Sequence, residues 1–290
     1  MILSVKDIHK SYGKEKVLRG ITFEIKEPQI IALIGPNGSG KSTLLNIITN
    51  LLAADRGEVT ILNKTNKDPN VFREISYMQD NSVLYDYLTG YDHLQFIGDV
   101  QGIPKEQIIK TAERVGMAGY LNKKVKNYSL GMKQHLLLTM AIVNDPKLLI
   151  LDEPLNGLDP TSAIRVRELL LALYESGTTI LLSSHNLGEI DRLTSKILFL
   201  KDGSLIKEDI SEYEQIHYEL VVDDVGKAES ALIQENISVE VVGNNLQINN
   251  LNAALLVLEH QKITILDIEK KMQGSEDRYR RIFGKQGESP

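Results

Sequence analysis

The hydrophobic pattern of the first fifty residues predicts strands, then a glycine-rich loop, then a helix. Residues 2–25 alternate in short apolar and polar steps interrupted by Gly13 and Gly20, which is typical of two or three strands joined by turns. Residues 30–34 form an apolar run that leads into the glycine-rich loop, and helix-forming residues follow from 41 to 49. A buried strand, a loop and a helix are therefore expected in this order.

The middle of the chain changes to helical periodicity and then returns to alternating strands and helices. Apolar residues recur at helical spacing in a segment of about residues 80–145, which predicts a helical subdomain. Apolar strands are expected at 148–151 and 179–182, with an amphipathic helix at 161–176 between them. Strand–helix–strand alternation predicts a parallel sheet covered by helices, so the fold class of residues 1–210 is α/β.

A second change of pattern near Ser211 predicts a separate C-terminal α+β domain over residues 211–290. Its expected elements are a strand at 217–222, a helix at 226–234, a hairpin of strands at 239–242 and 246–248, a helix at 251–259, a strand at 263–268 and a helix at 276–283. This strand–helix–strand–strand–helix–strand order predicts a small ferredoxin-like unit.

Composition narrows the possible functions. The chain has no cysteine, which excludes disulfides, zinc–thiolate sites and cysteine catalysis. Its net charge of -6 disfavours a protein that holds nucleic acid mainly through phosphates. Charges near the N-terminus do not fit a secretory signal, and the longer apolar runs, such as 136–143, fall short of the roughly 18 to 20 residues that span a bilayer. We therefore expect a chain that does not cross a membrane by itself.

The glycine-rich loop matches the phosphate-binding pattern G-x-x-x-x-G-K-[ST] in full. It consists of Gly35, Pro36, Asn37, Gly38, Ser39, Gly40, Lys41, Ser42 and Thr43. Glycines let backbone N–H groups approach a polyphosphate, and the following helix directs its positive end at the phosphates. We expect Lys41 to reach the β- and γ-phosphates and the Ser42 hydroxyl to bind Mg²⁺. The alternative, a glycine-rich turn without function, is disfavoured by the strand and helix on either side.

Two acidic residues and a histidine follow the apolar strands. Asp152 ends the strand at 148–151, where it is expected to hold Mg²⁺ through a water molecule. Glu153 is expected to point elsewhere because side chains alternate along a strand, and it is the candidate to activate the attacking water. His185 ends the next strand and is expected to contact the γ-phosphate. A solvated strand end is the alternative for these polar residues when the phosphate loop is not considered.

With these motifs in place, residues 2–210 resemble the ATP-binding subunit of ABC transporters. Further motifs carry the resemblance: Tyr12 for adenine stacking, Gln79 for sensing magnesium, Tyr128–Gln134 as the signature sequence, Asp159 in the D-loop of residues 156–160, and His185 as the switch histidine. The resemblance implies a P-loop NTPase cassette with a mixed sheet core, an N-terminal antiparallel β subdomain and an α-helical subdomain. It further implies Gln79 as a magnesium ligand and catalytic residue beside Glu153, His185 and Lys41.

The resemblance also implies the assembly. ATP and Mg²⁺ would be sandwiched between two subunits, in a homodimer or a heterodimer with a paralogue, with Ser129 and Gly131 of one subunit facing Lys41 of the other. A separate membrane permease would dock on the helical subdomain around residues 80–102, where aromatic residues form either a docking surface or ordinary helix core. These aromatic residues are Tyr85, Tyr87, Tyr91 and Phe96. The protein would then lie at the cytoplasmic face of the membrane, with no nucleic acid partner.

The signature departs from its commonest form. Leu130 replaces a glycine and Met132 replaces a glutamine, and the resulting Ser-x-Gly-Met-Lys-Gln resembles bacterial exporters of antibiotics and peptides. His135 stands where that subfamily usually has arginine. Two rival functions remain open from the sequence: a soluble ATPase that remodels ribosomes or DNA, and a nucleotide sensor that hydrolyses little.

Overall fold

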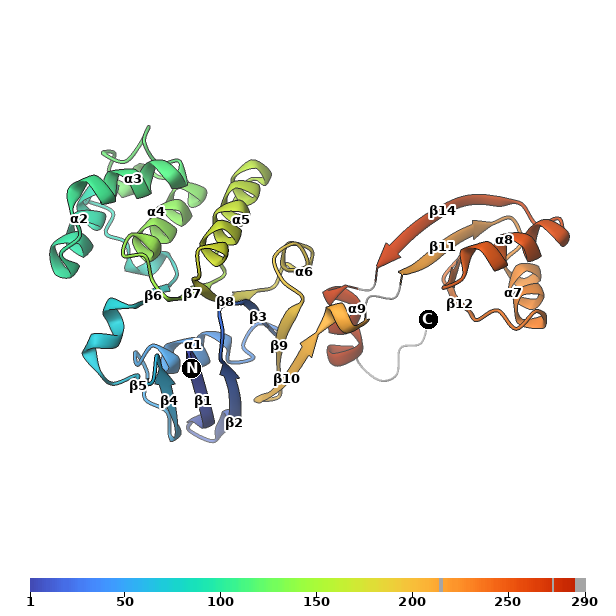
Figure 1. Ribbon diagram of the computed structural model, residues 1–290, viewed down its shortest axis with the longest axis horizontal. Coiled ribbons are helices and arrows are strands. Elements are labelled where there is room, and N and C mark those ends of the chain that lie inside the picture. Colours follow the sequence, from blue (N-terminus) through green and yellow to red (C-terminus); the bar gives the residue numbers. More distant parts are fainter. Residues whose placement is uncertain (214–215, 273, 285–290) are drawn as a thin grey trace. The chain divides into compact units, whose positions relative to one another are not determined.

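The computed structural model describes residues 1–213, 216–272 and 274–284. The chain divides into two compact units, Met1–Glu208 and Asp209–Pro290. The order of the elements in both units is shown in Figure 1.

An antiparallel sheet opens the first unit. Its strand order is β2-β1-β4-β5, and its strands are β1 (Leu3–Tyr12), β2 (Glu15–Ile25), β4 (Arg56–Ile61) and β5 (Lys64–Thr65). The two long strands pair in antiparallel register from Leu3 opposite Ile25 to Tyr12 opposite Glu15. Gly13 adopts a positive φ of 61° in the hairpin turn, a conformation that glycine reaches without strain. This turn presents Tyr12 at the end of its strand.

A six-stranded sheet forms the centre of the first unit. Its order is β10-β9-β3-β8-β7-β6, and its strands are β3 (Ile30–Ile34), β6 (Ile75–Met78), β7 (Leu148–Asp152), β8 (Thr179–Ser184), β9 (Lys196–Lys201) and β10 (Ser204–Asp209). The strands from β9 to β6 pair in parallel. Every residue of β3 and β8 is buried, as expected for strands covered on both faces. Helices α1 (Lys41–Ile48), α5 (Pro160–Glu175) and α6 (Leu187–Ile190) follow β3, β7 and β8.

Between β6 and β7 the chain builds the helical subdomain. Its helices are α2 (Gly90–Gln101), α3 (Lys105–Val115) and α4 (Leu130–Ile142), shown in green in Figure 1. Thr89 begins α2 with a reciprocal capping box to Asp92, and Gly102 and Gly116 end α2 and α3 in the left-handed conformation. Short 3₁₀ turns occur at Pro69–Arg73, Asn81–Val83 and Val125–Asn127.

The second unit has its own antiparallel sheet and core. After a 3₁₀ turn (Ile210–Tyr213), its elements are β11 (Ile216–Val222), α7 (Val225–Gln234), β12 (Val239–Val242), β13 (Asn245–Ile248), α8 (Leu251–His260), β14 (Ile265–Met272) and α9 (Ser275–Phe283). The strand order β12-β13-β11-β14 is the arrangement of a ferredoxin-like βαββαβ unit. Its core includes Leu220 and Leu246 from the sheet with Leu232 and Leu258 from the helices. Within the described residues, no helix has the length and apolar character needed to span a bilayer.

Candidate nucleotide-binding site

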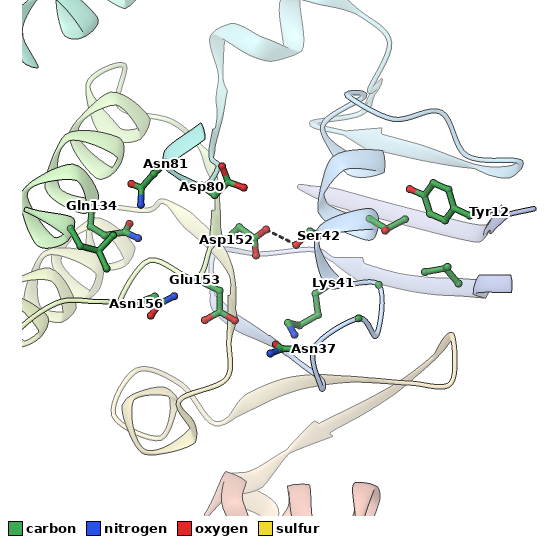
Figure 2. Close-up of a pocket in the computed structure, with 15 residues that line it drawn as sticks. Tyr12, Asn37, Lys41, Ser42, Asp80, Asn81, Gln134, Asp152, Glu153 and Asn156 are labelled. Carbon is green, nitrogen blue, oxygen red and sulfur yellow. Dashed lines mark hydrogen bonds between the residues drawn. The ribbon is translucent and has the colours of Figure 1, made fainter. Parts of the chain in front are cut away.

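A pocket of about 530 Å³ lies where β3 and β7 end (Figure 2). It is bounded by the first hairpin, the phosphate loop, the residues after β7 and the helical subdomain. The lining residues are Tyr12, Val17, Asn37, Gly38, Gly40, Lys41, Ser42, Thr43, Asp80, Asn81, Leu130, Gln134, Asp152, Glu153 and Asn156. Carboxyl edges of parallel strands are the usual ligand position in open α/β sheets.

The phosphate loop depends on its glycines for two different reasons. Gly38 and Gly40 have φ angles of 78° and 101°, in the region that side chains disfavour. Gly35 is required for space, because a Cβ there would lie 2.6 Å from the Ser39 Oγ and 2.7 Å from the Leu200 carbonyl oxygen. Helix α1 begins directly after Gly40, with no side-chain cap and no acidic residue in its first turn. Its first N–H groups therefore suit an anion.

Lys41 lies between the loop and the acidic residues (Figure 2). Its ammonium donates hydrogen bonds to the Gly35 carbonyl at 2.7 Å and to the Pro36 carbonyl at 3.2 Å. The residue is only 8% exposed, and burial lowers the pKa of Lys41, while the nearby Glu153 and Asp152 carboxylates oppose this shift. The pocket thus holds a buried cation that a polyphosphate would neutralise.

Ser42 and Asp152 meet although 110 positions separate them. The Ser42 Oγ donates to the Asp152 Oδ2 at 2.7 Å (Figure 2). A hydroxyl beside a carboxylate is a donor set that suits Mg²⁺, which usually takes one or two carboxylates together with phosphate oxygens and water. The described residues contain no group of three or more His, Asp or Glu side chains arranged to hold a metal ion.

Glu153 adopts a backbone conformation that the strand pattern did not predict. Its φ of 52° lies in the left-handed region, which is uncommon outside glycine and is concentrated at functional sites. Strand alternation predicted that Asp152 and Glu153 would point in different directions. Both nevertheless line the same pocket, since the chain leaves its strand at Glu153. The Glu153 Oε2 lies 2.8 Å from the Nδ1 of His185, so the histidine contacts a residue that lines the pocket.

Several lining residues were not predicted as site residues from the sequence, although Gln134 and Asn156 belong to predicted motifs. Asp80 and Asn81 come from the segment after β6, Gln134 comes from α4, and Asn156 follows β7 (Figure 2). Gln134 is 7% exposed, and its Oε1 is buried without a hydrogen-bond partner. Asp80 and Asn81 directly follow Gln79, and Gln134 ends the signature. Their closeness to these predicted motifs is the sequence signal that could have identified them.

Some sequence-predicted residues lie outside the pocket lining. Gln79 instead lines a second cavity of about 330 Å³ between β6, α2 and α4. Ser129 caps α4 by accepting a hydrogen bond from the Met132 N–H, and Asp159 caps α5. Among the described residues that line the nucleotide pocket, neither Ser129 nor Gly131 is present. Gly35, Pro36 and Ser39 belong to the loop but not to the lining, whereas Tyr12, half exposed, does line the pocket.

The altered signature residues have identifiable contacts. Leu130 packs against Gly157 of the D-loop, where an added Cβ would lie 2.2 Å from the Leu130 Cδ2. His135 is buried, and its Nδ1 lies 2.8 Å from the Tyr120 hydroxyl. Burial and the nearby Arg165 guanidinium lower the pKa of His135, which favours the neutral imidazole, while Asp159 opposes this shift. The signature and the D-loop are therefore in contact within one chain.

Comparison with known proteins identifies the family of this chain. The family model described as "ABC transporter" matches residues 18–156, and the model described as "AAA domain, putative AbiEii toxin, Type IV TA system" matches residues 124–191. The chain is 32% identical over 295 residues to the ABC transporter ATP-binding protein YhcH of Bacillus subtilis, covering 98% of this chain and 96% of YhcH. It is 36% identical over 213 residues to the lantibiotic transport ATP-binding protein SrtF of Streptococcus pyogenes, covering 73% of this chain and 92% of SrtF.

Among solved structures, the dimeric post-hydrolysis state of the ATP-binding cassette MJ0796, bound to ADP and Pi, superposes with a TM-score of 0.67. The two sequences are 26% identical, and the match covers 72% of this chain and 99% of that cassette. The fold and the site define an ATP-binding cassette. The chain belongs to the ATP-binding subunits of ABC transporters, which bind and hydrolyse ATP.

Proposed function

We propose that this subunit binds ATP together with Mg²⁺ and powers export of a peptide or antibiotic through a separate membrane permease. The relative SrtF is named for lantibiotic transport, and the Ser-x-Gly-Met-Lys-Gln signature resembles exporters of the same class of cargo. The observation that carries the proposal is the meeting of Lys41 and Ser42 with Asp152 and Glu153 in one pocket. This combination supplies a phosphate grip, metal ligands and a base.

In this proposal each residue has a separate task. Tyr12 stacks on adenine, the loop N–H groups and Lys41 bind the phosphates, and Ser42 and Asp152 hold Mg²⁺. When bound, Mg²⁺ neutralises charge on the β- and γ-phosphates. Glu153 orients and deprotonates the attacking water. His185, whose Nδ1 lies 2.8 Å from the Glu153 carboxylate, holds this carboxylate in place and contacts the γ-phosphate.

The proposed unit of hydrolysis is a head-to-tail dimer. One chain contributes the loop and the acids to its own pocket, but the hydrogen-bonding groups of Ser129 and Gly131 are not in that lining. A second copy would supply them from its α4 N-terminus, facing the γ-phosphate held by Lys41. ATP would favour the closed dimer because only that state contacts the nucleotide from both sides.

The second cavity is the proposed permease dock. It combines apolar walls such as Ile97 and Leu137 with Gln79, and it lies between the sheet core and the helical subdomain. A permease helix seated there would touch Gln79 directly and would connect movement of the helical subdomain with the metal end of the site. Exposed Tyr85, Tyr87 and Phe96 extend the available surface. Docking on a permease would place the protein at the cytoplasmic face of the membrane.

Mixing two inactive variants tests this arrangement. Lys41→Met disables the phosphate grip of its own pocket, and Ser129→Arg blocks the pocket of the partner. Each variant alone should hydrolyse little ATP. Because a mixed dimer keeps one intact pocket, an equal mixture should regain about one quarter of the wild-type sites. A mixture that stays inactive, although both variants fold and form dimers, contradicts the proposed exchange of residues between copies.

A further inference from the structure

Ser183 occupies the place where the two acidic residues of the site meet the neighbouring strand. It lies near the end of β8, is fully buried, and is paired in parallel register with Asp152 on β7. No motif singled it out, because a serine within an apolar strand is ordinarily read as packing.

The Ser183 hydroxyl uses both of its hydrogen-bonding capacities on the site. The hydroxyl donates a hydrogen bond to the Asp152 Oδ1 at 2.5 Å, and its oxygen accepts one from the Glu153 backbone N–H at 3.0 Å. A hydroxyl has one proton to donate, so these two partners fix its orientation. One side chain on β8 therefore contacts both acidic residues.

As a result, two serine hydroxyls hold the Asp152 carboxylate, one on each of its oxygens. Ser183 on β8 bonds one oxygen, and Ser42 on α1 bonds the other at 2.7 Å. If Ser42 bound a metal ion instead of Asp152, the Ser183 contact would still hold the Asp152 carboxylate. A group that holds a metal ligand in orientation affects metal binding and rate although it does not touch the metal.

The consequence for Glu153 concerns its backbone. Its φ of 52° is a disfavoured conformation that persists only where the surroundings enforce it. The hydrogen bond from its N–H to Ser183 constrains the backbone at the residue itself, and the carboxylate of the same residue lies 2.8 Å from His185.

We propose that Ser183 is a positioning residue for ATP hydrolysis, one that fixes the Asp152 carboxylate and the left-handed turn at Glu153 with a single hydroxyl. The proposal rests on the proposed roles of these two acids. Because the loop and Lys41 grip the phosphates independently of Ser183, its loss should affect turnover and Mg²⁺ dependence more than ATP binding.

The test compares Ser183→Ala with the wild type as full chains. Removing a hydrogen bond to a charged group, together with the N–H anchor, should lower kcat by about 10- to 100-fold. The KM for ATP should change by less than about threefold, and more Mg²⁺ should be needed for half-maximal rate. Ser184→Ala is the matched control, because it removes a buried hydroxyl from the same strand whose oxygen accepts the Asn186 N–H instead.

The outcomes separate the alternatives. A kcat for Ser183→Ala within about twofold of wild type, or an equal loss in Ser184→Ala, overturns the proposal. If the alanine variant does not fold, Ser183→Cys replaces it, because a thiol of similar size is a weak donor and acceptor, and the same selective loss of kcat is expected. A wild-type chain that binds ATP but hydrolyses none would contradict the roles proposed for Asp152 and Glu153, and the inference for Ser183 would fall with them.

Discussion

Replacing Glu153 with glutamine is the most direct test of the proposed chemistry. Glutamine preserves the length and shape of the side chain and still offers an oxygen to His185, which lies 2.8 Å from the carboxylate. The backbone N–H that bonds Ser183 is unchanged, so the left-handed turn should persist. The change therefore removes the negative charge and the basicity and little else.

The expected magnitude follows from the role of a general base. Such a group contributes about 10²- to 10⁴-fold to a rate, so kcat should fall by about this factor. ATP binding should be preserved or strengthened, because a negative charge is removed beside Lys41 and the proposed γ-phosphate position. With binding intact and hydrolysis blocked, ATP should accumulate in the closed dimer.

Two measurements check this expectation. Steady-state phosphate release reports kcat, and size-exclusion chromatography with and without MgATP reports the dimer. Glu175→Gln makes the same chemical change at an exposed position at the end of α5 and should behave as wild type. A Glu153→Gln variant that retains kcat within about threefold of wild type would refute the assignment of the base. A monomer in MgATP would refute the link between ATP and closure.

Three further predictions concern the nucleotide grip. Lys41→Met should weaken ATP binding by about tenfold or more, measured by titration with a fluorescent ATP analogue. Because burial lowers the pKa of Lys41 below 10.5, the ATP affinity of the wild type should also decline at a lower pH than it would with an exposed lysine. Unchanged affinity in either test contradicts the binding of phosphate by Lys41. Gly35→Ala should reduce ATP binding and the melting temperature, because its Cβ would lie 2.7 Å from the Leu200 carbonyl, whereas Gly119→Ala, with nothing within 4 Å, should change neither. Tyr12→Ala should raise the KM for ATP about fivefold or more and Tyr12→Phe should not, as expected for stacking; equal effects of the two variants would argue against it.

The parts of the fold that sequence predicted best are those where local rules and burial agree. The strand at Ile30–Ile34 and the helix beginning at Lys41 were predicted at the bounds where the structure begins them, since an apolar run and a glycine-rich loop mark the boundary clearly. The strand at Leu148–Asp152 and the helix at Pro160–Glu175 agree within a residue or two for the same reason. Hydrophobic spacing does not reveal the order of strands in the sheet. Only the structure shows that β8 lies between β3 and β7.

The parts of the site that sequence could not provide depend on this strand order. Ser183 is unremarkable in an apolar strand until β8 pairs with β7 and brings it opposite Asp152. The left-handed turn at Glu153 also has no local signal, because glutamate does not favour positive φ, and the N–H at this turn donates its hydrogen bond to a distant segment, Ser183 on the neighbouring strand. Motifs identify the groups proposed to contact the nucleotide, whereas Ser183, proposed to position them, meets them only through contacts between distant segments.

The position of the helical subdomain within the chain gives a physical reason for coupling hydrolysis to movement. It is inserted between the parallel strands β6 and β7. The chain leaves β6 at its carboxyl end, next to Gln79, and enters β7 at Leu148, so that β7 connects the helical subdomain directly to Asp152. At its far end, Ser129 begins α4 and Leu130 packs on Gly157 of the D-loop. A shift of this subdomain would therefore move the signature and, through the contact between Leu130 and Gly157, also displace the D-loop. In the proposed dimer, a second copy would hold ATP against Ser129, so the free energy of such a shift would depend on whether that copy has ATP bound.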